Sequence, residues 1–401
     1  MGSSDPRGGR DARATTQICT AVGRDDGRSP GPQPGEPTRY RWGVPLVLLG
    51  LSLACGGLTS CSGCERATDP PPIPDAAPSR ATDERRRDQE AITHRSLMGM
   101  LDSLRASQQE DGGWGDPATT GAVLIAFSSC GETEKAGGFQ RTVSRGLKYL
   151  EASQLPSGSL VSESGETALR DHAVAGLALA QSQSIEPSAQ REDCVARALG
   201  FAKRVRTDGG GWPARAGEAV ASIEASAWMT RFCESAASVL DEAAALHADD
   251  FAMLWAAIEP LADTDTWQVR DTGSASACDV GELGAMMLYV RAVCARAQGT
   301  ERLAEVAANS RLQGVLGEDG ASPLSRYFLA EAMFVLRGPR FADWVATMAE
   351  ATQRPPDGTR ALERQGSTPS RAHVWETALH VQLCSNFFGR VAHAWPQDSW
   401  R

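Results

Sequence analysis

The sequence predicts an all-α fold in which six helical hairpins form a double ring, an α6/α6 toroid. Three observations predict it. A short phrase that ends in Trp or Leu recurs along the chain at the ends of helical segments. Amphipathic helical segments alternate with segments that are apolar almost all round. These pairs repeat about every fifty residues, which is typical of arrays that stack or close on themselves.

The recurring phrase spans seven residues and begins with Gln or Arg. Its copies are Gln108–Trp114, Gln154–Leu160 and Arg206–Trp212, and each has a glycine two positions before its last residue: Gly112, Gly158 and Gly210. Glycine supplies the positive φ that the end of a helix needs. Because Trp buries a large area, we expect Trp114 and Trp212 to fold back and join adjacent units.

The first helix of each pair is amphipathic, with apolar residues three or four apart, as in Leu97, Leu101 and Leu104. This spacing puts the apolar side chains on one helix face. We therefore expect six outer helices at 92–107, 140–154, 191–206, 245–259, 300–313 and 340–353.

The second helix of each pair is rich in small and aliphatic residues, as in Ala173–Ala180. A helix that is apolar all round has to be buried. We expect these inner helices at 118–128, 171–181, 220–233, 279–294, 324–336 and 373–384. Ser, Thr and Asp favour N-cap positions, and the candidates are Thr119, Asp171, Ser222 and Asp279.

The region before the first helix resembles an export signal. A short apolar run follows Arg39 and Arg41 and ends at Leu58-Thr59-Ser60-Cys61, which is similar to the bacterial lipobox. We predict lipidation at Cys61, with a retained membrane anchor as the alternative. The expected location is the cell envelope, facing the periplasm or the exterior. The predicted parts are a disordered extension (1–42), a signal segment (43–61), a Pro-rich linker (62–90), the toroid (91–385) and a C-terminal tail (386–401).

Charge and cysteine spacing limit the partners. The net charge is -10 and the pI is about 5.2, so the chain lacks the basic field that nucleic acid requires. The ten cysteines show no spacing typical of structural zinc, and we predict no cofactor and no metal. The expected partners are a membrane, through the lipid, and an apolar ligand or a protein.

The repeats resemble those of a known family. Arg145–Gln154 followed by Gly158, together with Gln108–Trp114 and Asp208–Trp212, is similar to the QW repeat of squalene–hopene cyclases. The chain is therefore identified as resembling the terpenoid cyclase and protein prenyltransferase toroids, as a diverged bacterial lipoprotein. The resemblance spans roughly residues 92–385, and it concerns structural motifs, which do not imply catalysis.

The catalytic motifs of that family are missing from the sequence. Its cyclases protonate an alkene with a D-x-D-D motif, whereas Asp279-Val280-Gly281-Glu282 has Gly at the central position. Its prenyltransferases hold zinc through Asp-x-Cys, which does not occur in this chain. Whether the protein is an enzyme is left open, with a non-catalytic role favoured.

Polar and aromatic residues of the inner helices are the candidates for a site, because one end of the inner ring opens to solvent. Glu376 and His380 lie four apart, on one helix face, and fit an acid–base or metal pair. The other interpretation is capping and hydrogen bonding between helices. The catalytic candidates are Asp279, Glu282, Glu376 and His380, and the ligand-binding candidates are His172, Glu224, Trp228, Tyr327 and Glu331.

Three functions are compatible with these sequence features. The favoured one is a non-catalytic binding or scaffold protein of the envelope. The first alternative is an isoprenoid cyclase with a diverged acid. The second is a glycan-processing enzyme, since α6/α6 barrels also carry carbohydrate chemistry based on paired carboxylates.

Overall fold

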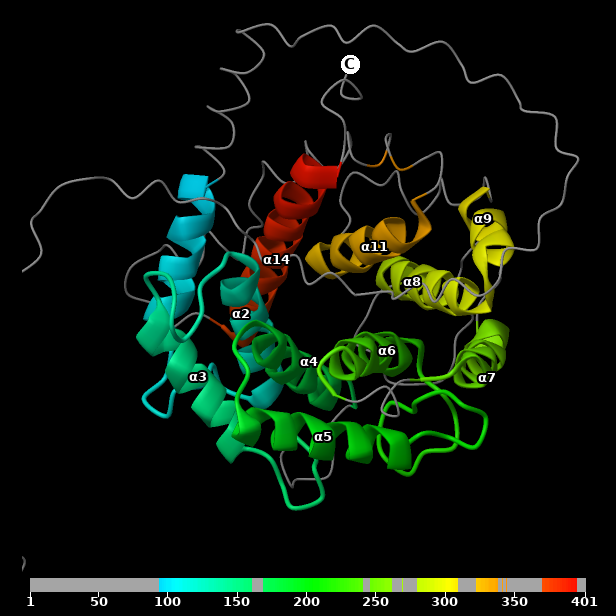
Figure 1. Cartoon of the computed structure of the whole chain (residues 1–401), viewed down its shortest axis with the longest axis horizontal. Helices are drawn as coiled ribbons and strands as arrows, with labels where there is room; N and C mark the ends of the chain where they lie inside the picture. The colour runs from blue at the N-terminus through cyan, green and yellow to red at the C-terminus, as the bar shows by residue number, and fades with distance from the viewer. Residues whose placement is uncertain are drawn as a thin grey trace, which may run out of the picture. The chain divides into compact units, whose positions relative to one another are not determined.

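The computed structural model confirms the predicted fold class, an all-α toroid (Figure 1). It describes residues 94–160, 169–240, 246–261, 269, 280–308, 322–337, 341, 344 and 370–394. Within these residues, β-structure is limited to isolated bridge positions, among them the pair Pro213 and Ala221. None of the described helices is long and apolar enough to span a membrane. Cys61 and Asp279 lie outside the described residues, so envelope anchoring through Cys61 stays a prediction.

An inner ring of helices surrounds a common axis. Each inner helix packs against the next, and the last one returns to pack against the first, which closes the ring (Figure 1). The ring is made, in order, of α2 (Pro117–Ser129), α4 (Leu169–Ile185), α6 (Ile223–Ala237), α8 (Val280–Gln298), α11 (Pro323–Leu336) and α14 (Arg371–Ala394). The described helices agree with the expected six-fold double ring.

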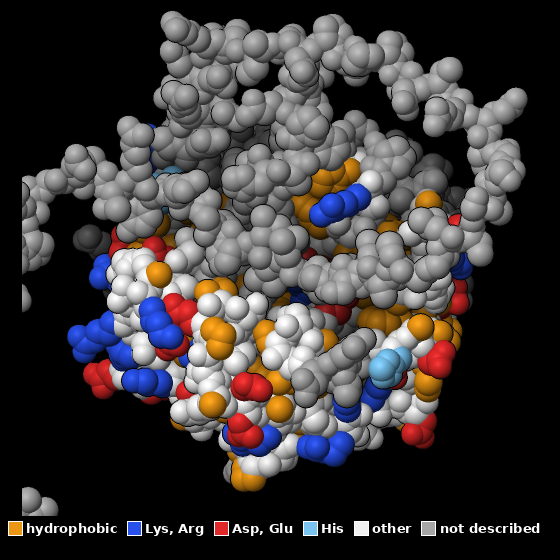
Figure 2. All heavy atoms as spheres, in the orientation of Figure 1, with side chains coloured by type: hydrophobic (Ala, Val, Ile, Leu, Met, Phe, Trp, Pro, Cys, Tyr) orange, Lys and Arg blue, Asp and Glu red, His pale blue; other side chains and the backbone are white. Residues whose placement is uncertain are grey.

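The outer helices cover the ring from outside. They are a helical segment at 94–106, α3 (Gln140–Ala152), α5 (Ala189–Arg204), α7 (Ala248–Ile258) and α9 (Thr300–Ala308), and a short 3-10 turn, η2 (Glu259–Leu261), follows α7. Helix α3 packs on α2 and α4, and α5 packs on α4 and α6. On the face drawn in Figure 2, acidic and basic side chains are mixed over these outer helices.

The inner helices are apolar because they face helices on several sides. In α4, every residue from Ala173 to Ala180 is buried. Small residues permit this packing: a Cβ on Gly121 would lie 2.8 Å from the backbone oxygen of Val174, and one on Gly176 would lie 2.8 Å from the ring of Phe232. The close approach of α2, α4 and α6 therefore depends on glycine.

The recurring phrase forms a clamp between consecutive outer helices. The Gln108 amide donates to Gly112 O (2.8 Å) in its own turn and to Thr142 O (3.0 Å) in α3. The Gln154 amide donates in the same way to Gly158 O (3.2 Å) and to Cys194 O (2.8 Å) in α5.

The third copy of the clamp uses a guanidinium in place of the amide. Arg206 donates to Gly210 O (2.5 Å) and to Asp250 O (2.6 Å) in α7. Trp212 then folds back and donates its Nε1–H to Ala202 O at 2.9 Å, as Trp114 does to Leu104 O at 2.7 Å. The predicted folding back of both indoles onto the preceding outer helix is confirmed.

Of two predicted N-caps, the one at α6 is confirmed and the one at α2 is not. Ser222 caps α6 by accepting from Ala225 N, as predicted. At α2 the cap is Asp116, whose carboxylate accepts from Thr119 N at 2.8 Å. Thr119 as an N-cap is therefore wrong: because Pro117 opens the helix, Thr119 already lies in its first turn.

Candidate functional site

All six inner helices begin at the same end of the ring. Arg371, the first residue of α14, pairs with the α2 cap Asp116 at 2.5 Å. Arg170 of α4 reaches Glu224 in the first turn of α6. Glu282, in the first turn of α8, accepts from Ser322, the cap of α11, at 2.5 Å. Asp116 of α2 also lies near Asp171 of α4, and Trp228, near the start of α6, packs on Tyr327, near the start of α11. These contacts join helix start to helix start, so the inner helices are parallel. We call this end the ring mouth.

Carboxylates gather at the ring mouth for an electrostatic reason. A helix N-terminus carries a partial positive charge and unpaired backbone N–H groups, which stabilise nearby anions. Asp116 occupies the N-cap of α2, while Asp171, Glu224 and Glu282 lie in the first turns of α4, α6 and α8. Parallel inner helices therefore bring acidic side chains to one end of the ring.

Arg170 organises the centre of the ring mouth. Its Nε donates to Asp171 Oδ1 and its Nη1 to Glu224 Oε1, both at 2.9 Å. The side chains are 25%, 15% and 9% exposed for Arg170, Asp171 and Glu224, so the cluster is largely withdrawn from water. Its guanidinium also lies over the ring of Trp375, 5.7 Å from the centroid. One cation thus holds two carboxylates and an aromatic ring together.

Burial makes the Asp171 carboxyl group harder to ionise than a carboxyl group in water. Burial raises the pKa of Asp171, Arg170 opposes that change, and the nearby carboxylate of Asp116 adds to it. A carboxyl group with a raised pKa keeps its proton at higher pH and can give it to a substrate. The ring mouth therefore contains a candidate proton donor next to further carboxylates.

An aromatic cluster fills the ring below the mouth. Trp228 stacks on Tyr327 (centroids 5.4 Å apart, planes at 17°) and meets Phe328 and Trp375 edge to face at 4.8 and 6.1 Å. Trp228 and Tyr327 are buried, whereas Trp375 is partly exposed. The two predicted ligand-binding aromatics, Trp228 and Tyr327, therefore lie together, in contact with the mouth through Trp375.

Other candidates lie away from the Arg170 cluster. Glu331 is buried and pairs with Arg231 of α6 at 2.9 Å. His380 is buried and contacts Cys384 Sγ through Nε2 at 3.4 Å. Burial, with the charge of Arg326, lowers the pKa of His380 to about 4. Glu376 is partly exposed on the same helix. Among the described residues, no cluster of His, Cys, Asp and Glu has the arrangement of a metal site.

His172 belongs to a repeat turn, and its ring is fully buried. Its Nδ1 accepts from Leu160 N (3.1 Å), so Nε2 carries the proton and faces Ala198 O (3.1 Å). The equivalent N–H groups of Trp114 and Trp212 donate to Thr120 and Ser226. His172 therefore takes the place of an inner-helix hydroxyl. Both of its ring nitrogens are occupied within the fold, which gives it a structural role, and its predicted ligand-binding role stays a prediction.

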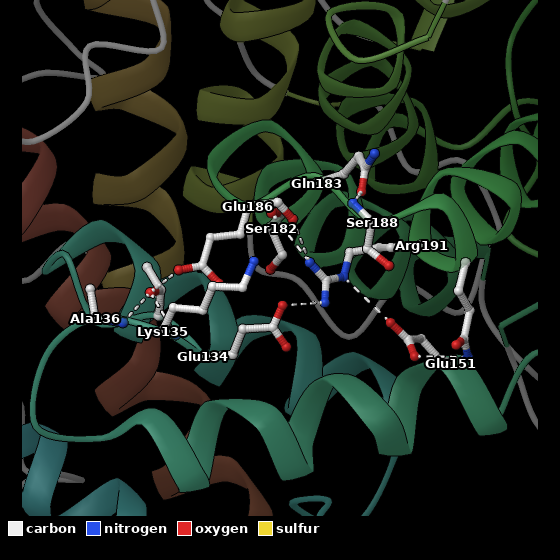
Figure 3. Close-up of polar contacts among 11 residues, drawn as sticks. Glu134, Lys135, Ala136, Glu151, Ser182, Gln183, Glu186, Ser188 and Arg191 are labelled. Atoms are coloured by element: carbon white, nitrogen blue, oxygen red, sulfur yellow. Dashed lines mark hydrogen bonds and ion pairs between the residues drawn. The ribbon is translucent and has the colours of Figure 1, made fainter. Parts of the chain in front are cut away.

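A second polar cluster surrounds Arg191 at the other end of α4 (Figure 3). This buried side chain donates to Glu134 (2.9 Å) and to Glu186 O (3.0 Å), and its Nε lies 3.4 Å from Glu151. The adjoining pocket has an empty volume of about 220 Å³, part of it open to solvent. Because Arg191 ties α5 to α3 and to the end of α4, its geometry is that of a structural clamp.

Sequence reasoning missed three charged residues of the ring mouth, namely Asp116, Arg170 and Arg371. A signal existed for two of them. Asp116 directly precedes Pro117, which is the usual arrangement of an N-cap and a first-turn proline. Arg170 directly precedes the candidate Asp171. The partner of an arginine, however, depends on which helices meet, and a pattern along the chain does not contain that information.

The fold and the ring mouth together define the class of protein as an α/α toroid with acidic and aromatic groups at one end of its inner ring. No protein-family model matches the sequence, and no curated protein resembles it closely enough to count as a relative.

Solved structures resemble the fold. Among them is the GH76A α-1,6-mannanase of a Salegentibacter species, with 10% sequence identity and a TM-score of 0.50, over 71% of this chain and 98% of that one. An inactive variant of this mannanase in complex with α-1,6-mannotriose matches with a TM-score of 0.50, and another with α-1,6-mannotetrose matches with 0.51. Both of these matches have 10% identity over 72% of this chain.

These comparisons correct the functional predictions. The structural neighbours are mannanases, so they support the glycan-processing alternative over the non-catalytic scaffold and the isoprenoid cyclase. The assignment to terpenoid cyclases and prenyltransferases is likewise not supported, although the toroid class inferred from it is confirmed. The QW-like phrase describes how outer helices are clamped, and a clamp of this kind says nothing about chemistry.

The inactive variants of the mannanase carry changes at two consecutive aspartates. In this chain, consecutive aspartates occur at residues 25–26 and 249–250. The first pair lies outside the described residues. In the second, Asp250 lies in the first turn of the outer helix α7, where it binds Arg206 and closes a capping box with His247. The pair at 249–250 therefore belongs to a repeat clamp, and the acidic groups of the ring mouth come from separate helices.

Proposed function

We propose that this protein is a glycan-processing enzyme that hydrolyses a glycosidic bond at the ring mouth. The observation that carries the proposal is the Arg170 cluster, in which one guanidinium holds Asp171 and Glu224 at 2.9 Å each, beside Trp375. The structural likeness to an α-1,6-mannanase supports it.

Glycoside hydrolysis needs two carboxyl groups in different protonation states. One protonates the leaving oxygen, and the other, ionised, stabilises the developing positive charge or activates water. Asp171 suits the first role because burial raises its pKa. Glu224 suits the second because its carboxylate is held by the Arg170 guanidinium. Arg170 acts as the positioning residue, since it fixes both side chains relative to each other.

The test is hydrolysis of a panel of α- and β-linked oligosaccharides that includes α-1,6-mannotetraose. The release of reducing ends measures the rate. Asp171→Asn and Glu224→Gln should each lower kcat by about a hundredfold or more, because each removes one partner in proton transfer. Asp193→Asn and Glu192→Gln, on the exposed face of α5, are the matched controls and should keep full activity.

The outcomes separate cleanly. Loss of activity in both mouth variants, with both controls active and all four folded, supports the proposal. If no glycan of the panel is cleaved, or if Asp171→Asn and Glu224→Gln remain as active as the controls, the proposed activity does not reside at the ring mouth.

A further inference from the structure

The indole N–H of Trp228 has no hydrogen-bond partner among the described residues, although the side chain is only 1% exposed. Buried indole N–H groups normally find an acceptor, because an unmet donor costs free energy. Trp114 and Trp212 follow that rule by donating to Leu104 O and Ala202 O. The unsatisfied donor of Trp228 therefore calls for an explanation that the fold does not provide.

Trp228 is connected to the ring mouth by two routes. It follows Glu224 by four residues on α6, so both side chains lie on one face of that helix. It also packs edge to face against Trp375, whose ring lies below the Arg170 guanidinium. The unsatisfied donor is thus one layer below the carboxylates that we assign to catalysis.

The surroundings of Trp228 match the chemistry of a sugar ring. A pyranose presents an apolar C–H face together with hydroxyl and ring oxygens that accept hydrogen bonds. Trp228, Trp375 and Tyr327 offer aromatic faces, and the indole of Trp228 adds one donor. Binding sites for small molecules combine apolar walls with a few polar groups in this way.

Arg170 controls access to this layer. Its guanidinium is 25% exposed and lies over Trp375, so a sugar that enters from the mouth meets Arg170 before it reaches this layer. Both carboxylate partners of Arg170 lie at the mouth and hold its guanidinium in this place.

We propose that Trp228 is a specificity-determining residue, which donates its Nε1–H to a hydroxyl or ring oxygen of one uncharged pyranose unit that packs beside Trp375. The inference rests on the proposed function only in that the ligand is a glycan. It assigns that glycan a neutral unit, because the guanidiniums of Arg170 and Arg371 at the mouth are already paired with carboxylates and neither is left for an anionic sugar.

The test compares two indoles that differ in their hydrogen bonding. Trp228→Phe keeps an aromatic ring and removes the N–H, and Trp212→Phe is the matched control, whose lost bond is structural. Calorimetric titration uses α-1,6-mannotriose and the tightest neutral binder of the oligosaccharide panel. We expect Kd to rise about tenfold in Trp228→Phe, since one hydrogen bond to a ligand is worth about 1.4 kcal/mol. Trp212→Phe should bind normally and melt at a lower temperature.

A second measurement needs no variant. With ¹⁵N-labelled tryptophan, the Nε1–H resonance of Trp228 should shift on addition of the glycan, while that of Trp212 should stay in place. Equal affinity in the two variants together with an unmoved Trp228 resonance overturns the inference, as does the absence of binding by any neutral glycan. If Trp228→Phe binds more weakly but no glycan is hydrolysed, the role of Trp228 is supported and the proposed reaction is contradicted. If glycans are hydrolysed but Trp228→Phe binds with unchanged affinity, the reaction is supported and the role of Trp228 is contradicted.

Discussion

The repeat turns and the ring mouth lie at the same end of the hairpins, yet they are held together by different contacts. The turns form a rim, where the side chains Gln108, Gln154 and Arg206 donate to backbone oxygens of the next outer helix. The mouth lies inside that rim and is held by side chain to side chain ion pairs, such as Arg170 with Glu224. Backbone oxygens are present whatever the sequence, so the rim tolerates variation in its neighbours and the mouth does not. This contrast predicts that rim variants lose stability and mouth variants lose activity.

The largest effect is expected at the rim, for Gly158→Ala. A Cβ at this position would lie 2.2 Å from Arg197 O, and its backbone φ is +86°. Overlap with a backbone atom and a left-handed conformation together should lower the free energy of unfolding by about 4 kcal/mol. Chemical denaturation measures it. Gly131→Ala is the control, because Gly131 has a φ of +80° but open space around it, so only about 1 kcal/mol should be lost there. Equal losses of unfolding free energy in the two variants would contradict the close contact between Gly158 and α5.

The next effect belongs to the mouth. Arg170→Met removes the cation that positions Asp171 and Glu224, and kcat should fall about a hundredfold, or about 2.7 kcal/mol in the activation barrier. Its stability should change by less than the rim variant does, because the methionine side chain still covers Trp375. The pH dependence of kcat is the discriminating readout: the upper limb should move to higher pH, since Arg170 opposes the rise in the pKa of Asp171. If Arg170→Met keeps full activity and an unchanged pH profile of kcat, Arg170 has only a structural role.

The smallest expected effect is the pH dependence of stability that comes from His172, a residue of the rim. Burial lowers the pKa of His172 from 6.5 to about 4, so the folded state stays neutral while the unfolded chain takes up a proton. Its contribution to stability is complete above pH 6.5 and is lost as the pH falls toward 4. Between pH 7 and pH 5 this amounts to about 2 kcal/mol. His172→Asn should show a shallower loss over that interval in denaturation curves, and an equally steep loss in the variant contradicts the assignment.

Sequence reasoning reached the rim because its information is local. The spacing of Gln108, Gly112 and Trp114 is set within one turn, and the apolar run at Ala173–Ala180 already indicates burial. The mouth was reached only in part. Glu224, Trp228 and Tyr327 were found as inner-helix residues, but Arg170 was not, since its role appears only when α4, α6 and α14 meet. The functional prediction failed for the same reason: it favoured a non-catalytic role because the cyclase and prenyltransferase motifs are missing, whereas the Arg170 cluster is assembled only where separate helices meet.

The return of α14 to α2 has a consequence for biosynthesis. Gln382 donates to Ala122 O at 2.8 Å across 260 residues of sequence, and Arg371 reaches Asp116, so the flank of the first inner helix is completed by a segment made much later in synthesis. Until then, a largely apolar side of α2 is exposed to water, while later hairpins are still being added. Contacts so distant along the chain form slowly, and unprotected apolar surfaces of this kind attract other chains. Synthesis of α14 is therefore the step that lets a growing, aggregation-prone arc of hairpins close into a ring.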